Sequence, residues 1–378
     1  MEPTSTSTKV PAEIWAKIIP SRNLSVSDLQ NFPLPELAIS KSPVPQPLQN
    51  ILSRLPPNIT DVEEIILLPT PSEALLKSLL KCTEIRQSQS FICEHLWHSR
   101  TQLRTPLWTI EYWLEVLRIH PIKLLWASAQ RNLDFIQKER RLTDNSMDLI
   151  KQVSSVFSKL SWKDNIKGFP AQIPPEHLTS YLTQEWLSDE HENQMLHLLQ
   201  KELALQHPES NTDITTTYFF QILSELYRNG TYDAPEGAWI RRKSQDFATG
   251  VYDVFATIVN INSNHWVPIV VDFRASKILY GDSMGGVIDE KIEEILTWWT
   301  YHHTGVTFTK TYLPITRQRD GFSCGLLAWN ALATYLLPHI HSLFNALDMA
   351  KERLKIFLQV IEQHDQVGRV LLTMNFRL

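Results

Sequence analysis

The chain has 378 residues, of which 43% are hydrophobic and 20% are charged, so it can bury the cores of two or three domains. Its net charge of −5 argues against a protein that works mainly by holding nucleic-acid phosphates, because such binding needs an excess of basic residues. Its three cysteines, Cys82, Cys93 and Cys324, are too few and too scattered for a disulfide framework or a zinc knuckle.

The first residues, MEPTSTSTKVPAEIW, lack a basic start followed by an apolar core, so we expect no secretory signal. No apolar run reaches the length of about 18 residues that a membrane span needs. We therefore expect an intracellular protein of the nucleus or the cytoplasm, with no membrane partner.

Residues 1–60 are expected to be mostly irregular. Nine of the 22 prolines lie between Pro33 and Pro71, and the run KSPVPQP places proline at every second position. This spacing removes backbone donors and favours extended chain. A linker is the simpler interpretation, and a ligand for a proline-binding groove is the alternative.

Residues 61–165 are expected to form a small helical domain, whose role the sequence does not assign. Apolar residues at three- and four-residue spacing predict one helix that opens at Pro121 and a second over residues 149–160. The first apolar stripe consists of Ile122, Leu125, Trp126, Ala129, Leu133 and Ile136.

Residues 166–378 are expected to form an α+β domain. Runs of β-branched and aromatic residues predict four strands, at 251–260, 265–273, 276–282 and 306–315. Apolar periodicity predicts four helices, at 182–203, 288–303, 324–337 and 349–363. There is no glycine-rich phosphate loop, so no nucleotide site is expected.

Cys324 is the candidate nucleophile. It lies in QRDGFSCGLLAWNALATYLL, where a polar turn meets an apolar helix. Free N–H groups and the helix dipole at such a position favour the thiolate. The alternative is an inert buried cysteine, which is the commoner role for a cysteine considered alone.

Three further residues at the ends of predicted elements complete a candidate site. His265 begins one predicted strand, and Asp282 ends the next, so two neighbouring strands can place them side by side. Gln318 precedes the cysteine by six residues, and its amide can donate to an oxyanion together with the Cys324 N–H. Each has an ordinary alternative role, as a capping histidine, a turn aspartate or a loop glutamine.

The order and spacing of these residues resemble the ubiquitin-like protease family. These SUMO-type cysteine proteases cleave after the C-terminal glycine of a modifier and are distantly similar to the adenovirus protease. Three matches are His265-Trp266 at a strand start, YGDS around Asp282, and QRDGFSCG with its Gln-to-Cys spacing. The fourth is EWLSDE, which resembles the Trp-Leu-x-Asp motif that opens the domain. The resemblance covers about residues 170–378.

This resemblance implies a papain-like-clan domain with a central mixed sheet flanked by helices, and a SUMO- or ubiquitin-like modifier as partner. It implies that Cys324 is the nucleophile, His265 the base, Asp282 its orienting acid and Gln318 part of the oxyanion hole. Substrate-binding residues would be Trp266, which walls the channel for a Gly-Gly tail, and Trp186 and Asp189. Neither a metal nor a cofactor is required.

Two positions depart from the family pattern. Ser323 stands where many SUMO-type proteases have Asp, and Asp320 stands where the family usually has Asn. Neither change removes a catalytic atom, but the two departures leave the identity of the modifier undecided.

Two other functions remain as alternatives. One is a module that binds a modifier without cleaving it, and the other is a thiol acyltransferase of related fold. The second would need a basic phosphate-binding cluster, and the only candidate, Arg241 to Lys243, is expected to be an exposed loop patch. His302 and His303 are expected to lie at a solvated helix end.

Overall fold

The computed structural model describes residues 8–37, 51–82, 85, 88–92, 103–138 and 144–375. Cys93 and the KSPVPQP run lie outside these ranges. The chain divides into two compact units: residues 1–131 with 157–164, and residues 132–156 with 165–378. The three domain boundaries expected from the sequence stay a prediction.

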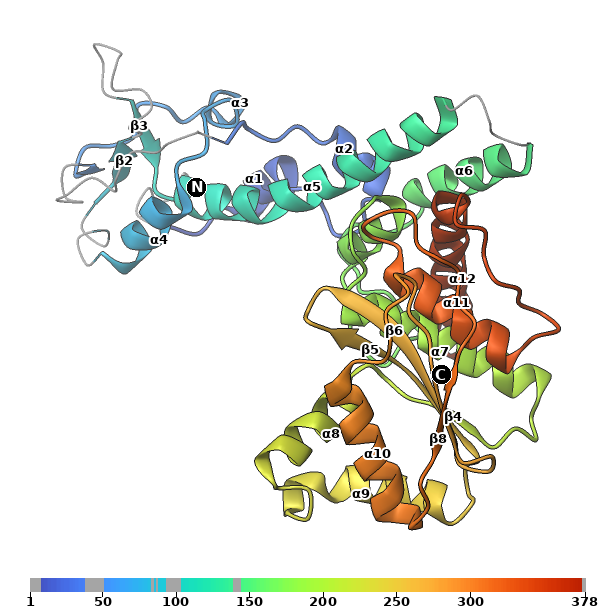
Figure 1. The fold of residues 1–378 in the computed structure, drawn as a ribbon. Helices are drawn as coiled ribbons and strands as arrows, with labels where there is room; N and C mark the ends of the chain where they lie inside the picture. Colours follow the sequence, from blue (N-terminus) through green and yellow to red (C-terminus); the bar gives the residue numbers. More distant parts are fainter. Residues whose placement is uncertain are drawn as a thin grey trace. The chain divides into compact units, whose positions relative to one another are not determined.

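The first unit contains a small antiparallel sheet and short helices (Figure 1). Its strands are β1 (Leu52–Ser53), β2 (Ser90–Ile92) and β3 (Arg104–Pro106). Its helices are α1 (Ala12–Ile18), α2 (Val26–Asn31), α3 (Val62–Ile65), α4 (Glu73–Lys81) and the larger part of α5 (Thr109–Lys138). Helices make up most of the regular structure of this unit, which confirms the mostly helical N-terminal region, and the small sheet was not expected.

Two short helices, α1 and α2, lie within residues 1–60, which the sequence predicts to be mostly irregular. The start of α2 is fixed by a capping box, in which Asp28 Oδ2 accepts from Ser25 N at 3.0 Å and Ser25 Oγ accepts from Asp28 N at 3.1 Å. These reciprocal bonds satisfy backbone donors that would otherwise lack partners. A short capped helix of this kind has too few turns to show a periodic pattern.

Helix α5 begins at Thr109, so the expectation of a helix opened by Pro121 is wrong. Proline removes one N–H from the helix ladder, and the apolar residues on both sides of it compensate by their burial. Trp113 is fully buried upstream and packs edge-on against Phe91, and Trp126 is fully buried downstream and packs against Phe157. Tertiary packing therefore stabilises the helix on both sides of Pro121, so that it continues past the proline.

The second unit contains a mixed five-stranded sheet, which confirms the α+β expectation. The strand order is β4 (Thr212–Ile214), β5 (Val254–Ile261), β6 (His265–Asp272), β7 (Lys277–Tyr280) and β8 (Thr309–Tyr312). β6 pairs antiparallel with both neighbours, and the outer pairs β4–β5 and β7–β8 are parallel. β6 is buried along seven of its eight residues, as a central strand covered on both faces should be.

Helices cover both faces of this sheet (Figure 1). On one side lie α8 (Tyr218–Asn229), α9 (Ala238–Ala248) and α10 (Glu290–Thr304), whose aromatic residues form one core with β5, β6 and β7. On the other side lie α7 (Asp189–Gln206), α11 (Cys324–Leu336) and α12 (Met349–Asn375). The 3₁₀ segments η4 (Pro175–Leu182) and η5 (Pro235–Gly237) complete the unit, together with residues 132–138 of α5 and nearly all of α6 (Asp144–Phe157).

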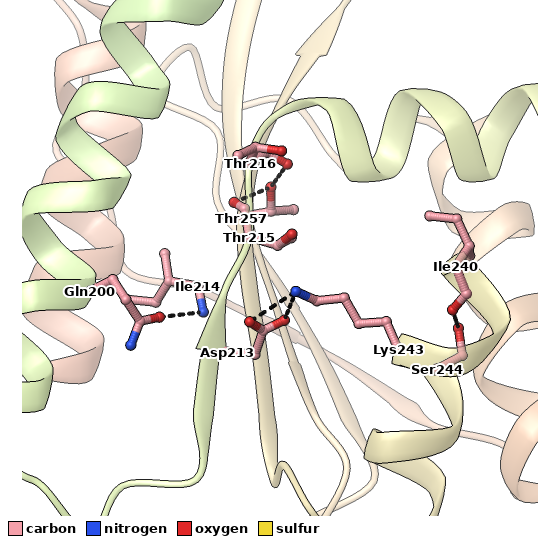
Figure 2. A network of polar contacts seen from close by, with 9 residues as sticks. All are labelled: Gln200, Asp213, Ile214, Thr215, Thr216, Ile240, Lys243, Ser244 and Thr257. Carbon is pink, nitrogen blue, oxygen red and sulfur yellow. Dashed lines mark hydrogen bonds and ion pairs between the residues drawn. The ribbon is translucent and has the colours of Figure 1, made fainter. Parts of the chain in front are cut away.

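Edge strand β4 is held by side chains from both flanking helices, as Figure 2 shows. Gln200 Oε1 of α7 accepts from the Ile214 backbone at 2.9 Å, and Lys243 of α9 pairs with Asp213 at 2.8 Å. Arg241 of the same helix donates to the Ala234 carbonyl at 2.8 Å. The expectation that Arg241 to Lys243 form a loop patch is therefore wrong, because they lie on a helix and two of them have structural partners.

Candidate active site

Cys324 is the first residue of α11, and its side chain is buried. Burial raises the pKa of its thiol, and backbone hydrogen bonds from Trp266, Gly325 and Cys324 itself oppose that rise. The sulfur thus lies among the free N–H groups of a helix start and beside the first residues of β6. Such donors favour the thiolate, and that is what a nucleophilic cysteine needs.

His265 and Asp282 meet as the strand arrangement predicts. His265 begins β6, and its Nε2 lies 2.8 Å from Oδ1 of Asp282, which follows β7. A carboxylate only accepts, so Nε2 carries the proton and Nδ1 is left to accept another. Both side chains are buried, so water does not compete for the contact.

Backbone donors fix the Asp282 carboxylate. Oδ1 also accepts from Met284 N at 2.7 Å, and Oδ2 accepts from Gly286 N at 3.0 Å. The turn after β7 therefore closes around the carboxylate and orients it toward the imidazole. Three donors satisfy most of the hydrogen-bonding capacity of this buried charge.

Gln318 lies in the loop between β8 and α11 and is tied to the residue after Asp282. Its Oε1 accepts from Ser283 Oγ at 3.0 Å, and its backbone N–H donates to the Ser283 carbonyl at 2.8 Å. Its Nε2 donates to the Asp320 carbonyl at 2.7 Å, which engages one of the two amide protons. Its role in an oxyanion hole stays a prediction.

The two positions that depart from the family pattern contact each other. Asp320 Oδ2 accepts from Ser323 Oγ at 2.8 Å, and Oδ1 accepts from the Phe322 and Ser323 backbones at 3.0 and 2.8 Å. This carboxylate therefore stabilises the turn that immediately precedes Cys324. The sequence marked both residues only as departures, because their pairing depends on the turn geometry.

The predicted substrate-binding residues lie around the same loop. Trp186 is half exposed, and its Nε1 donates to the Gly321 carbonyl at 2.5 Å. Trp266 is buried, and its Nε1 donates to the Leu187 carbonyl at 2.8 Å. Asp189 starts α7 and, with Trp266, lines a groove of about 590 Å³ bordered by α8 and the β5–β6 turn.

Arg353 is a buried residue of this region that the sequence analysis missed. Its Nη1 donates to the carbonyls of Ser180 and Thr183 at 2.7 and 2.8 Å. Its Nη2 donates to the backbone carbonyls of Glu185 and Phe322 at 2.8 and 2.9 Å, which links the 180–185 segment to the loop before Cys324. One feature of the sequence indicates its burial, because Arg353 lies on the apolar stripe of α12 between Met349 and Phe357.

The histidines at the end of α10 differ from the expectation. His302 is exposed, but His303 is partly buried, and its Nε2 lies 2.5 Å from the Tyr232 hydroxyl. Burial lowers the pKa of His303 to about 4, so the expectation of a solvated helix end is wrong for this residue. Within the described ranges no group of histidine, cysteine and carboxylate side chains is placed to hold a metal ion.

Residues 185–367 match the Ulp1 protease family, C-terminal catalytic domain. A yeast Ulp1 protease domain in complex with Smt3, the yeast orthologue of SUMO, is 20% identical over 59% of this chain and 96% of that one, with a TM-score of 0.44. The catalytic domain of a Chaetomium thermophilum Ulp1-like SUMO protease is 16% identical over 57% and 88%, with a TM-score of 0.41. The Xanthomonas campestris effector XopD bound to ubiquitin is 18% identical over 46% and 91%, with a TM-score of 0.33. Among the helices described, none is long and apolar enough to cross a membrane.

Proposed function

The chain carries a catalytic domain of the Ulp1 protease family, and on that premise we propose that it hydrolyses the peptide or isopeptide bond after the C-terminal glycine of a SUMO-type modifier. The observation that supports this most is the buried contact of 2.8 Å between His265 and Asp282, next to a cysteine at a helix start. We propose the nucleus or the cytoplasm as its place of action.

In this mechanism, Nδ1 of His265 takes the proton of the Cys324 thiol. The thiolate attacks the carbonyl carbon of the terminal glycine, and a sulfur–carbon bond forms. The Cys324 backbone N–H and the Gln318 amide donate to the resulting oxyanion, and one such donor contributes about 3–4 kcal/mol. Asp282 stabilises the imidazolium and holds its orientation.

The tetrahedral intermediate then breaks its carbon–nitrogen bond. The protonated His265 gives its proton to the leaving amine, which is a lysine side chain or a precursor peptide. Water, with His265 again as base, attacks the thioester and releases the modifier's carboxylate and the free thiol. The reaction needs only the side chains and backbone donors named here, together with water.

The surface around the nucleophile fits a protein substrate with a narrow tail. Trp186 and Trp266 lie on segments that bracket the Cys324 loop, so they would enclose a Gly-Gly tail. The groove beside Asp189 and Trp266 would meet the folded part of the modifier. Glycine has no Cβ, so a Gly-Gly tail needs less room than any other dipeptide.

The test is covalent labelling with ubiquitin-like proteins that carry a thiol-reactive C-terminal group. We expect one member of the panel to form an adduct with the intact protein and none to form it with the Cys324→Ala variant. No adduct from a folded protein would favour a module that binds a modifier without cleaving it. Acetyl transfer from acetyl-coenzyme A would favour the acyltransferase, although Arg241 and Lys243 already have structural partners.

A further inference from the structure

Glu192 is a buried carboxyl group that the proposed mechanism does not use. It lies in the first turns of α7, and its side chain has no exposed surface. Neither of its carboxyl oxygens has a hydrogen-bond partner among the described residues. Buried carboxyl groups are ordinarily paired, so this one requires an explanation other than stability.

The carboxyl group lies directly against the nucleophile helix. A Cβ placed on Gly325, the residue after Cys324, would lie 1.9 Å from Glu192 Oε1 and 3.2 Å from Trp266 Cδ1. The carboxyl oxygen thus occupies the space that any larger residue would take at position 325. Glu192 thus lies buried beside the residue that follows Cys324, which is itself buried.

The charges that face Glu192 come from four elements. Arg353 of α12 is the only cation among them, and four of its N–H groups are already donated to backbone carbonyls. Tyr181 of η4, Cys324 of α11 and Asp189 of its own helix are neutral or acidic. Burial raises the pKa of Glu192 well above its usual value, Asp189 adds to that rise, and Arg353 opposes it.

An ionised carboxylate with no hydrogen bond would be costly in such a place. Burial without a hydrogen-bond partner therefore favours the neutral form of this carboxyl group, and its pKa is raised accordingly. The charge of Glu192 raises the pKa of the Cys324 thiol, so the two groups ionise as a coupled pair in this low-dielectric site.

We propose that Glu192 is a positioning residue for the nucleophile: a neutral acid beneath Gly325 whose loss of a proton suppresses formation of the Cys324 thiolate. This inference rests on the proposed function only in taking Cys324 as the reactive thiol. The cysteine then gains reactivity with rising pH more slowly than an isolated thiol, because an ionised Glu192 opposes ionisation of the Cys324 thiol.

The test measures the rate at which iodoacetamide alkylates Cys324 between pH 5 and 9. It compares the full-length wild type with the Glu192→Gln and Glu236→Gln variants, and mass spectrometry follows the peptide that contains Cys324. Glu236 is exposed, so its variant is the matched control. Glu192→Gln should react at the wild-type rate at pH 5, where both side chains are neutral. Its rate relative to wild type should rise with pH, to about tenfold at pH 9, because the charge of Glu192 raises the pKa of the Cys324 thiol.

A rate ratio that does not change with pH would overturn the proposal, as would a ratio below one throughout. Glu192→Met provides a second neutral side chain if the glutamine variant does not fold. Melting temperatures give an independent measurement: wild type and Glu192→Gln should melt together near pH 5, and the variant should melt higher at pH 8. Neither measurement uses a modifier, so a failure of the proposed peptidase activity can be distinguished from a failure of this proposal.

Discussion

At the scale of single residues, Asp282 combines two tasks, because it orients His265 and closes the turn after β7. Its two oxygens accept from the imidazole and from two backbone N–H groups. Asparagine would place an amide NH₂ against one of these donors. Asp282→Asn should therefore lower kcat/KM by about 10²–10⁴-fold, since the tautomer and orientation of the base are both lost.

This can be measured with a modifier that carries a fluorogenic C-terminal leaving group. Asp272→Asn is the matched control, because Asp272 lies at the far end of β6 and its carboxylate accepts from the Ala275 backbone. Activity of Asp282→Asn within threefold of wild type would remove Asp282 from the mechanism.

Gly325 offers a second residue-scale prediction. A methyl group there would collide with the Glu192 carboxyl, at 1.9 Å from Oε1 and 2.9 Å from Cδ. Gly325→Ala should lower the unfolding free energy by about 1–3 kcal/mol, because the packed atoms around the added methyl group cannot all move away from it. In a Glu192→Ala background the same substitution should cost at least about 1 kcal/mol less, as expected for residues in direct contact.

Urea unfolding of the four proteins in this cycle gives the coupling energy. Gly321→Ala in the preceding loop is the control, since a Cβ there would meet no atom within 4 Å. Equal costs of Gly325→Ala in both backgrounds would show that the two side chains do not compete for the same space.

At the scale of elements, α12 acts on the site through Arg353. Its guanidinium holds four carbonyls, three from the 180–185 segment and one from the nucleophile loop. A lysine ammonium is a compact charge and cannot bridge this set. Arg353→Lys should lower the unfolding free energy by about 3 kcal/mol, because buried carbonyls lose their donors.

Denaturant unfolding and the alkylation rate of Cys324 would both report this change. Arg319→Lys is the control, because Arg319 is exposed in the same loop. If Arg353→Lys kept both the stability and the alkylation rate of wild type, the link between these two segments would be carried by other contacts.

The start of α7 should be sensitive to acid through His191. Its Nε2 donates to the His177 carbonyl at 2.7 Å, and its Nδ1 accepts from the Ser188 backbone at 3.1 Å, so only the neutral ring satisfies both. Burial lowers the pKa of His191 to about 4 from its usual 6.5. The stabilisation is therefore complete above pH 6.5 and is lost as the pH falls toward 4, by about 3 kcal/mol in total.

His191→Gln should remove this acid-dependent loss, because glutamine can cap the helix at this position without titrating. Unfolding free energies between pH 4 and 7 provide the measurement. His207→Gln, a change to the partly exposed residue after the same helix, is the comparison variant. A His191→Gln slope equal to that of wild type would show that another group titrates in this window.

The sequence predicts those elements whose pattern is long and whose burial is regular. Strands β5 to β8 and helices α10 and α11 follow from runs of β-branched residues or apolar periodicity, and the contact of His265 with Asp282 follows from pairing β6 with β7. The sequence did not predict β4, because this strand has only three half-buried residues, which side chains of α7 and α9 hold in place. Short elements of this kind are determined by tertiary contacts, which periodicity does not report.

The buried charges of the site were harder to predict for the same reason. Glu192 and Arg353 resemble ordinary surface residues of amphipathic helices until the packing of α7, α11 and α12 is known. Charged residues are rarely buried, so a prediction from sequence places them at the surface. The contact of His265 with Asp282 and the place of Cys324 at a helix start were predictable because these residues lie at the ends of elements, and their catalytic roles stay a prediction.

At the scale of the whole molecule, the C-terminal unit includes residues that precede the boundary expected at 166. Asn132 Nδ2 donates to the Leu182 carbonyl at 2.7 Å, and Phe135 and Ile136 of α5 line a small cavity beside Arg353. The end of α5 therefore supports the 180–185 segment, which Arg353 connects to the nucleophile loop.

A fragment of residues 166–378 should thus be less stable than one of residues 132–378. Loss of the Asn132 hydrogen bond and of the apolar cover should lower the melting temperature by roughly 5 °C, since each kcal/mol shifts a chain of this size by about 2–4 °C. Asn132→Ala in the full chain isolates the hydrogen bond and should account for a fraction of that shift. Equal melting temperatures for the two fragments would instead support a domain that begins at 166, because residues 132–156 would then add nothing to its stability.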